Sequence, residues 1–203
     1  MSCRLNQAAL ARYVQHAEQG RVVVFDTETT GLDRLDQIVQ IAAAEYVGGT
    51  RTRTLNLFVR PTCPVSPGAE AVHHISQEFL DEHGLDPREA LRQFFAFVGE
   101  DALLVGHNVR FDLGMLRNEC REFGYPATPE AFFSCDTAAL ARRFVPGLPH
   151  YRLCTLIEAL GLDGRNSHDA LDDTLACAEL FFDLVRRIPM VPEDPVYQPL
   201  FDF

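Results

Sequence analysis

The chain has 203 residues, with 18 basic and 29 acidic side chains, and its formal net charge is −11 at pH 7. This balance excludes the basic footprint of a protein that scans long nucleic acid. It is compatible with a nuclease, because carboxylates that hold metal ions add to the same negative total. Every basic side chain is arginine, which excludes a P-loop lysine and a lysine Schiff base. A phosphatase with an Asp nucleophile and a supporting lysine is disfavoured for the same reason.

The length predicts a single domain over residues 1–203, with a motif-bearing core at about 21–187. No run approaches the ~18 apolar residues of a membrane span, and the first ten residues lack the apolar core of a secretion signal. The six cysteines form no Cys-x-x-Cys pair, which is typical of reduced thiols. We therefore expect a cytoplasmic protein with no membrane partner.

The first third of the chain alternates between one helix and several strands. Apolar side chains at helical spacing predict a helix at 5–18, ended by Gly20. Apolar runs predict strands at 21–26, 36–47 and 53–61, and Gly48-Gly49 predicts a hairpin between the last two. The proline-rich passage 61–76 is expected to be a loop.

Helical patterns dominate the rest of the chain. Helices are predicted at 87–99, 111–124, 138–147, 151–161 and 167–187. Short strands are predicted at 103–108 and 132–137, and the proline-rich tail 189–203 is expected to be extended. An early hairpin followed mainly by helices favours an α/β fold, with a mixed sheet of about five strands flanked by helices.

Two acidic side chains end the first predicted strand. Asp26 and Glu28 are two residues apart, so they share one face of the strand. Neighbouring carboxylates repel each other unless a cation lies between them. The pair therefore indicates a metal site, and the alternative is a solvated acidic turn.

A third carboxylate, Asp112, falls on the apolar stripe of the helix at 111–124. A bare buried charge is costly, and the arginines of this helix point elsewhere. A divalent cation is the simplest partner for the Asp112 carboxylate, because Mg²⁺ prefers oxygen ligands from a few carboxylates and a substrate phosphate.

The last predicted helix begins with His168, Asp169, Asp172 and Asp173. Asp172 lies four residues after His168, and this spacing alone favours it as the metal ligand of the helix. A helical wheel, however, places Asp172 on a polar stripe and Asp173 on the apolar side. We therefore expect Asp173 to be the buried ligand. His168 can exchange a proton near neutral pH, and its alternative is a purely structural role.

Three segments together resemble the signature motifs of the DEDDh 3′–5′ exonucleases, which include the proofreading epsilon subunit, ribonuclease T and oligoribonuclease. They are VVVFDTETTGLD (22–33), GHNVRFDLGML (106–116) and SHDALDDTLA (167–176), and the resemblance runs over about 21–185. AVHHISQEFL (71–80) also resembles the epsilon-type segment that touches substrate, and it points to His73 more than to His74.

The resemblance implies a ribonuclease H-like fold and a two-metal site. Two Mg²⁺ or Mn²⁺ ions would be held by Asp26, Glu28, Asp112 and Asp173, with His168 as the general base. The residues implied to bind substrate are Thr27, Thr29, Gly31, Leu32, His73, Asn108 and Phe111. Two of these have ordinary alternatives, because Asn108 can cap a helix and Phe111 can fill the core. Gln40 departs from the Glu of many relatives, and we expect it to lie outside the metal shell.

The expected function is a metal-dependent 3′–5′ exonuclease that releases nucleoside 5′-monophosphates from single-stranded DNA or short RNA. The net negative charge favours contact with only a few nucleotides at the 3′ end. The alternative is a non-catalytic binding module of a polymerase or repair complex. A DNA polymerase is a candidate partner. The tail YQPLFDF (197–203) resembles a sliding-clamp peptide, although its spacing is one residue short. Docking of Phe201 and Phe203 on the protein's own surface is the favoured alternative.

Overall fold

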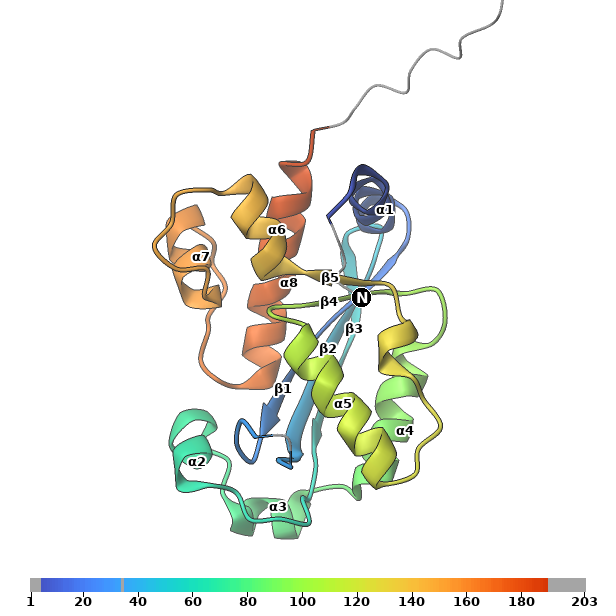
Figure 1. The fold of residues 1–203 in the computed structure, drawn as a ribbon, viewed down its shortest axis with the longest axis vertical. Helices are drawn as coiled ribbons and strands as arrows, with labels where there is room; N and C mark the ends of the chain where they lie inside the picture. The colour runs from blue at the N-terminus through green and yellow to red at the C-terminus, as the bar shows by residue number, and fades with distance from the viewer. Residues whose placement is uncertain (1–4, 34, 190–203) are drawn as a thin grey trace, which may run out of the picture.

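Five strands form one mixed sheet in the order β3-β2-β1-β4-β5 (Figure 1). A computed structural model describes residues 5–33 and 35–189. The strands are β1 (Arg21–Thr29), β2 (Ile38–Val47), β3 (Thr50–Phe58), β4 (Leu103–Gly106) and β5 (Ser134–Asp136). The central strand β1 is antiparallel to β2 and parallel to β4. The predicted mixed α/β sheet is confirmed.

Two helical layers cover the sheet because β1 is apolar on both faces. Val22 and Val24 belong to one core cluster with helices α1, α6, α7 and α8, whereas Val23 and Phe25 belong to another with α4 and α5. The first layer comprises α1 (Gln7–Glu18), α6 (Thr137–Phe144), α7 (Leu153–Leu160) and α8 (Ala170–Arg186). The second comprises α4 (Pro87–Val98) and α5 (Arg110–Glu122), and a short 3₁₀ turn, η1 (Pro129–Ala131), follows α5.

The hairpin between β2 and β3 lies where it was predicted. Gly48 and Gly49 have φ of 54° and 77°, the backbone that a tight two-residue turn requires and that glycine adopts most easily. Because the turn has only two residues, β3 begins at Thr50 and not at residue 53.

The expectation of a loop over 61–76 is wrong. Helix α2 (Pro67–His73) lies inside it, and α3 (Gln77–His83) follows. The Ser66 hydroxyl accepts a hydrogen bond from the Ala69 amide at 3.2 Å, and Pro67 occupies the first helical position. Ser-Pro is a helix-start signal, which the high proline content of the segment obscured. Both helices lie at the end of the sheet where β1 ends (Figure 1).

The first strand is also longer than predicted. It continues through Thr27, Glu28 and Thr29, and these residues pair with β2. Its polar end looked like a turn in the sequence, yet the two threonines are buried.

Among the helices of the described residues, none is both long and apolar enough to cross a membrane. The clamp-like segment 197–203 and the rest of the expected tail after Pro189 lie outside the described residues.

Candidate active site

The carboxyl end of β1 carries the first two carboxylates of the site. Asp26 lies opposite Ala42 and Glu28 lies opposite Gln40 in the β1–β2 register. Their side chains alternate with Thr27, so they point to the face that α8 covers.

Helix α8 adds a third carboxylate to this pair. One carboxylate oxygen from each of Asp26, Glu28 and Asp173 lies within 4.8 Å of the others. Asp173 is 6% exposed, whereas Asp172 is exposed, as the helical wheel predicts. Asp173 accepts a hydrogen bond from the Ser167 amide at 2.9 Å and another from the Asn166 side chain.

Asp112 approaches from the opposite layer. It lies in the first turn of α5, after the neighbouring parallel strand β4, and its side chain is buried. The Thr27 hydroxyl donates a hydrogen bond of 2.7 Å to Asp112 Oδ1. Asp112 is outside the group of three, but its negative charge raises the pKa of Asp26.

Burial raises the pKa of all four carboxyl groups, and repulsion from neighbouring carboxylates raises the pKa of Asp26 and of Glu28 further. Burial is the largest cause in each case; it raises the pKa of Glu28 to about 8 and that of Asp112 to about 7. The pKa of Asp26 lies well above its usual range, and that of Asp173 is also raised. No ion pair to any of the four is recorded within the described residues. Clustered carboxylate oxygens that are buried or half-buried fit a hard divalent metal ion.

His168 lies directly before α8 and next to this cluster. It is exposed, its φ is 58°, and its charged form lowers the pKa of Asp173. The helix proper begins after Asp169, which is its N-cap. The imidazole therefore lies at the solvent side of the carboxylates, where it can exchange a proton with water.

A cavity of about 500 Å³ opens beside Glu28. Its lining includes four residues that the sequence assigned to substrate, which are Thr29, Gly31, Leu32 and His73. Leu32 is 85% exposed and Val72, on the opposite wall, is 45% exposed. Large apolar side chains in water at the rim of a cavity are typical of a ligand site.

His73 is one of the polar residues that line this cavity. It is buried, and its Nδ1 accepts a hydrogen bond from the Ile75 amide at 3.0 Å. Its Nε2 faces the Thr29 backbone without a hydrogen bond of normal geometry to a described residue. Burial lowers the pKa of this imidazole. An unsatisfied buried nitrogen costs free energy, which a ligand in the cavity can offset.

Gly31 is needed for a close approach within the same loop. A Cβ at this position would lie 2.6 Å from Asp36 Oδ2. That carboxylate is held by the Asp33 amide at 2.6 Å and by the Thr30 hydroxyl at 2.8 Å, so it cannot easily move away.

The structure does not bring the other three expected substrate residues into this cavity. Thr27 faces α5 and holds Asp112. Asn108 is exposed and has a φ of 60°, and its backbone N–H donates a hydrogen bond to Asp136 Oδ1 at 3.1 Å. Phe111 is 38% exposed. The alternative roles are not observed either, because α5 has no side-chain cap and Phe111 is outside the core.

Sequence reasoning missed the buried Glu119 on α5 and the contact that the buried Gln40 makes. Glu119 accepts a hydrogen bond from the Ile38 amide at 3.0 Å, and burial raises its pKa to about 7. Glu119 lies seven residues after Asp112, on the same apolar stripe of the helix. A helical wheel therefore predicts that Glu119 is buried. Gln40 joins β2 to the start of α8, and no local pattern predicts that contact.

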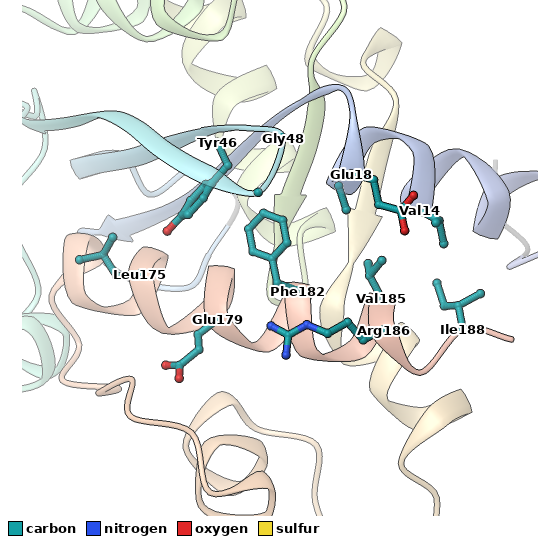
Figure 2. Close-up of a pocket in the computed structure, with 12 residues that line it drawn as sticks. Val14, Glu18, Tyr46, Gly48, Leu175, Glu179, Phe182, Val185, Arg186 and Ile188 are labelled. Carbon is teal, nitrogen blue, oxygen red and sulfur yellow. The ribbon is translucent and has the colours of Figure 1, made fainter. Parts of the chain in front are cut away.

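A larger cavity, of about 730 Å³, lies between α1, the β2–β3 turn and α8 (Figure 2). Tyr46 and Phe182 lie on its walls, and Ile188 lies at its end. None of the motif carboxylates lines it, because the α8 residues that do so come after Asp173.

The sheet order and the carboxylate cluster at the end of its central strand define an α/β nuclease of ribonuclease H-like fold. The exonuclease family RNase_T matches residues 23–181, and the chain belongs to this family. The expected membership of an exonuclease family is confirmed.

The chain is 30% identical over 171 residues to the PolC-type DNA polymerase III of Caldanaerobacter subterraneus subsp. tengcongensis, covering 84% of the chain and 12% of the polymerase. It is 29% identical over 174 residues to the 3′-5′ exonuclease DinG of Bacillus subtilis, covering 85% of the chain and 18% of DinG. The chain thus spans less than a fifth of the length of these relatives.

Two solved structures have the same fold. Escherichia coli exonuclease I in complex with a dT13 oligonucleotide superposes with a TM-score of 0.73 at 23% identity, over 82% of this chain and 41% of that one. Exonuclease X in complex with 5′ overhanging duplex DNA superposes with a TM-score of 0.66 at 27% identity, over 81% of this chain and 91% of that one.

Proposed function

We propose that the chain is a single-domain, metal-dependent 3′–5′ exonuclease that releases nucleoside 5′-monophosphates from the 3′ end of single-stranded DNA or short RNA. The observation that carries the proposal is the convergence of four carboxylates, the buried Asp112 and Asp173 and the half-buried Asp26 and Glu28, beside a cavity with an unsatisfied histidine nitrogen.

Asp26, Glu28, Asp112 and Asp173 are the proposed ligands of two divalent ions, Mg²⁺ or Mn²⁺. When bound, such ions lower the pKa of water and neutralise charge on a phosphodiester. The donor set fits them, because it consists of carboxylate oxygens whose charges repel each other in the absence of a cation. Both Glu28 and Asp112 raise the pKa of Asp26 by charge repulsion, so Asp26 would hold an ion together with either of them.

His168 is the proposed general base. Its imidazole lies in solvent at the edge of the cluster, and histidine is the side chain that most often transfers protons in catalysis. There it can take the proton of an attacking water and return it to solvent between turnovers.

The cavity beside Glu28 is the proposed site of the terminal nucleotide. The exposed Leu32 side chain can pack on the base, and His73 Nε2 can hydrogen-bond to the sugar or its hydroxyl. Phe111, exposed on the first turn of α5, would contact the preceding nucleotide.

The polarity and the substrate rest on the relatives. DinG is named a 3′-5′ exonuclease, and exonuclease I and exonuclease X were solved with DNA. The net charge of −11 favours a binding site that contacts only a few nucleotides. The PolC-type relatives support association with a DNA polymerase, and a cytoplasmic location is part of the same proposal.

The test is digestion of matched DNA and RNA oligonucleotides, labelled at the 5′ or the 3′ end, in Mg²⁺, Mn²⁺ or EDTA. We expect a 5′-labelled ladder that shortens from the 3′ end, labelled mononucleotide from the 3′-labelled strand, and no cleavage in EDTA.

The Asp26→Ala variant should keep the melting temperature of the wild-type protein and lose cleavage. Retention of more than about a tenth of wild-type activity in this variant would contradict the metal assignment. Cleavage of the substrate at internal positions by the wild-type protein would contradict the assignment of an exonuclease activity.

A further inference from the structure

Gln40 is a fully buried amide in β2, on the face of the sheet that α8 covers. Its Nε2 donates hydrogen bonds to Asp169 Oδ2 at 3.0 Å and to Asn56 Oδ1 at 2.9 Å. Its Oε1 accepts from the Ala170 amide at 3.2 Å. Because both N–H groups and the oxygen have partners, the amide has one preferred orientation.

Asp169 completes the contact from the other side. Its Oδ1 accepts from the amides of Leu171 at 2.9 Å and Asp172 at 3.2 Å, while Oδ2 accepts from Gln40. Three backbone N–H groups that a helix start leaves without a partner are thereby satisfied, one by Gln40 and two by Asp169. The first turn of α8 is thus tied to β2.

This contact determines where two site residues lie. His168 directly precedes Asp169, and its imidazole makes no hydrogen bond to another described residue, so its backbone alone positions it. Asp173 lies one turn further, and its amide donates to the Asp169 carbonyl at 2.9 Å. Glu28 lies opposite Gln40 in the neighbouring strand. Gln40 therefore links the strand next to Glu28 with the segment that carries His168.

We propose that Gln40 and Asp169 are a matched pair of positioning residues, an amide donor and a carboxylate acceptor, that hold His168 and Asp173 against the end of β1. Neither is placed on substrate. The proposal rests on the proposed function for its effect on turnover, but the pair itself can be tested without any activity.

The experiment exchanges donor and acceptor. Gln40→Glu removes the N–H groups and brings two carboxylates together. Asp169→Asn alone leaves two amides that compete to donate, with one oxygen to serve both the helix cap and Gln40. In the double variant the new amide at 169 can donate to the new carboxylate at 40, which still accepts from the Ala170 amide.

Turnover is the first readout. We expect each single variant to lower kcat about 10- to 100-fold, the size of effect that small misplacement of a reacting group produces, with KM within about threefold. The double variant should regain at least about tenfold in kcat, since contacting residues deviate from additivity.

Amide hydrogen exchange of Ala170, Leu171 and Asp172 in metal-free protein is the second readout. Protection should fall about tenfold in each single variant and return in the double variant, because exchange reports local opening of the first turn. Gln15→Glu, the same change on an exposed position of α1, is the matched control and should behave as wild type.

Three outcomes would overturn the proposal. They are a kcat within twofold of wild type for Gln40→Glu, a kcat loss equal to the loss of folded protein, and a double variant no better than the worse single one. If the wild-type protein degrades no 3′ end, the proposed function fails. The exchange measurements would then still decide whether the pair holds the first turn of α8.

Discussion

The Thr27 hydroxyl and Asp112 Oδ1, 2.7 Å apart, join the end of β1 to the first turn of α5. Both side chains are buried. Burial raises the pKa of Asp112 and the hydrogen bond from Thr27 lowers it, and the balance is a pKa of about 7. Thr27 thus holds Asp112 toward Asp26 and favours its ionised form.

Thr27→Val keeps the shape of the side chain and removes this donor. The pKa of Asp112 should rise, and because a metal ligand must be deprotonated, the increase of activity with pH should move to higher pH. We expect kcat/KM to fall at pH 7, because less of the Asp112 carboxyl group is ionised there, and to recover toward pH 9. Thr54→Val, on an exposed position of β3, is the control. An unchanged pH profile would remove Thr27 from this role.

His168→Ala should lower turnover by about 10²- to 10⁴-fold, the usual contribution of a general base. Its affinity for Mn²⁺, measured by calorimetry, should stay near that of wild type, because the imidazole is not among the proposed ligands. A large loss of Mn²⁺ binding would instead make His168 a ligand.

Asp172 and Asp173 are neighbours with different environments. Asp172 is exposed and accepts from the Ser167 hydroxyl at 2.8 Å, whereas Asp173 is buried within the carboxylate cluster. Asp173→Asn should therefore all but remove activity, and Asp172→Asn should stay within a few-fold of wild type. Initial rates on one labelled oligonucleotide compare them directly. The opposite ranking would refute the assignment of Asp173.

Glu119 predicts a pH dependence of stability in the metal-free protein. Its pKa is raised from 4.5 to about 7 by burial, so its stabilising contribution is fully present below pH 4.5 and is lost as pH rises through about 7. That gap corresponds to about 3 kcal/mol. Glu119→Gln keeps an acceptor for the Ile38 amide and should reduce the decline in the free energy of unfolding between pH 5 and 8.

Urea unfolding at several pH values in EDTA measures this change. Glu122→Gln, an exposed position on the same helix, is the matched control and should leave the pH dependence as it is in wild type. An identical pH dependence in Glu119→Gln and wild type would contradict the burial argument.

Local periodicity is enough to assign each carboxylate to a face of its strand or helix. Alternation along a strand places Asp26 and Glu28 together, and a step of 100° per residue separates Asp172 from Asp173. Apolar runs and the Gly48-Gly49 turn likewise predicted the sheet. The error at 61–76 was also local, since the Ser66-Pro67 start of α2 was hidden among other prolines.

The way in which these strands and helices meet depends on contacts between distant parts of the chain. Thr27 and Asp112 are separated by 85 positions in the chain, and Gln40 and Asp169 by 129. Such contacts depend on which strands pair, in which register, and on how each helix packs across the sheet. The orientation of His73 toward the cavity depends on α2 in the same way. Periodicity assigns a side chain to a face, but the partner it finds there is chosen by the packing of distant segments.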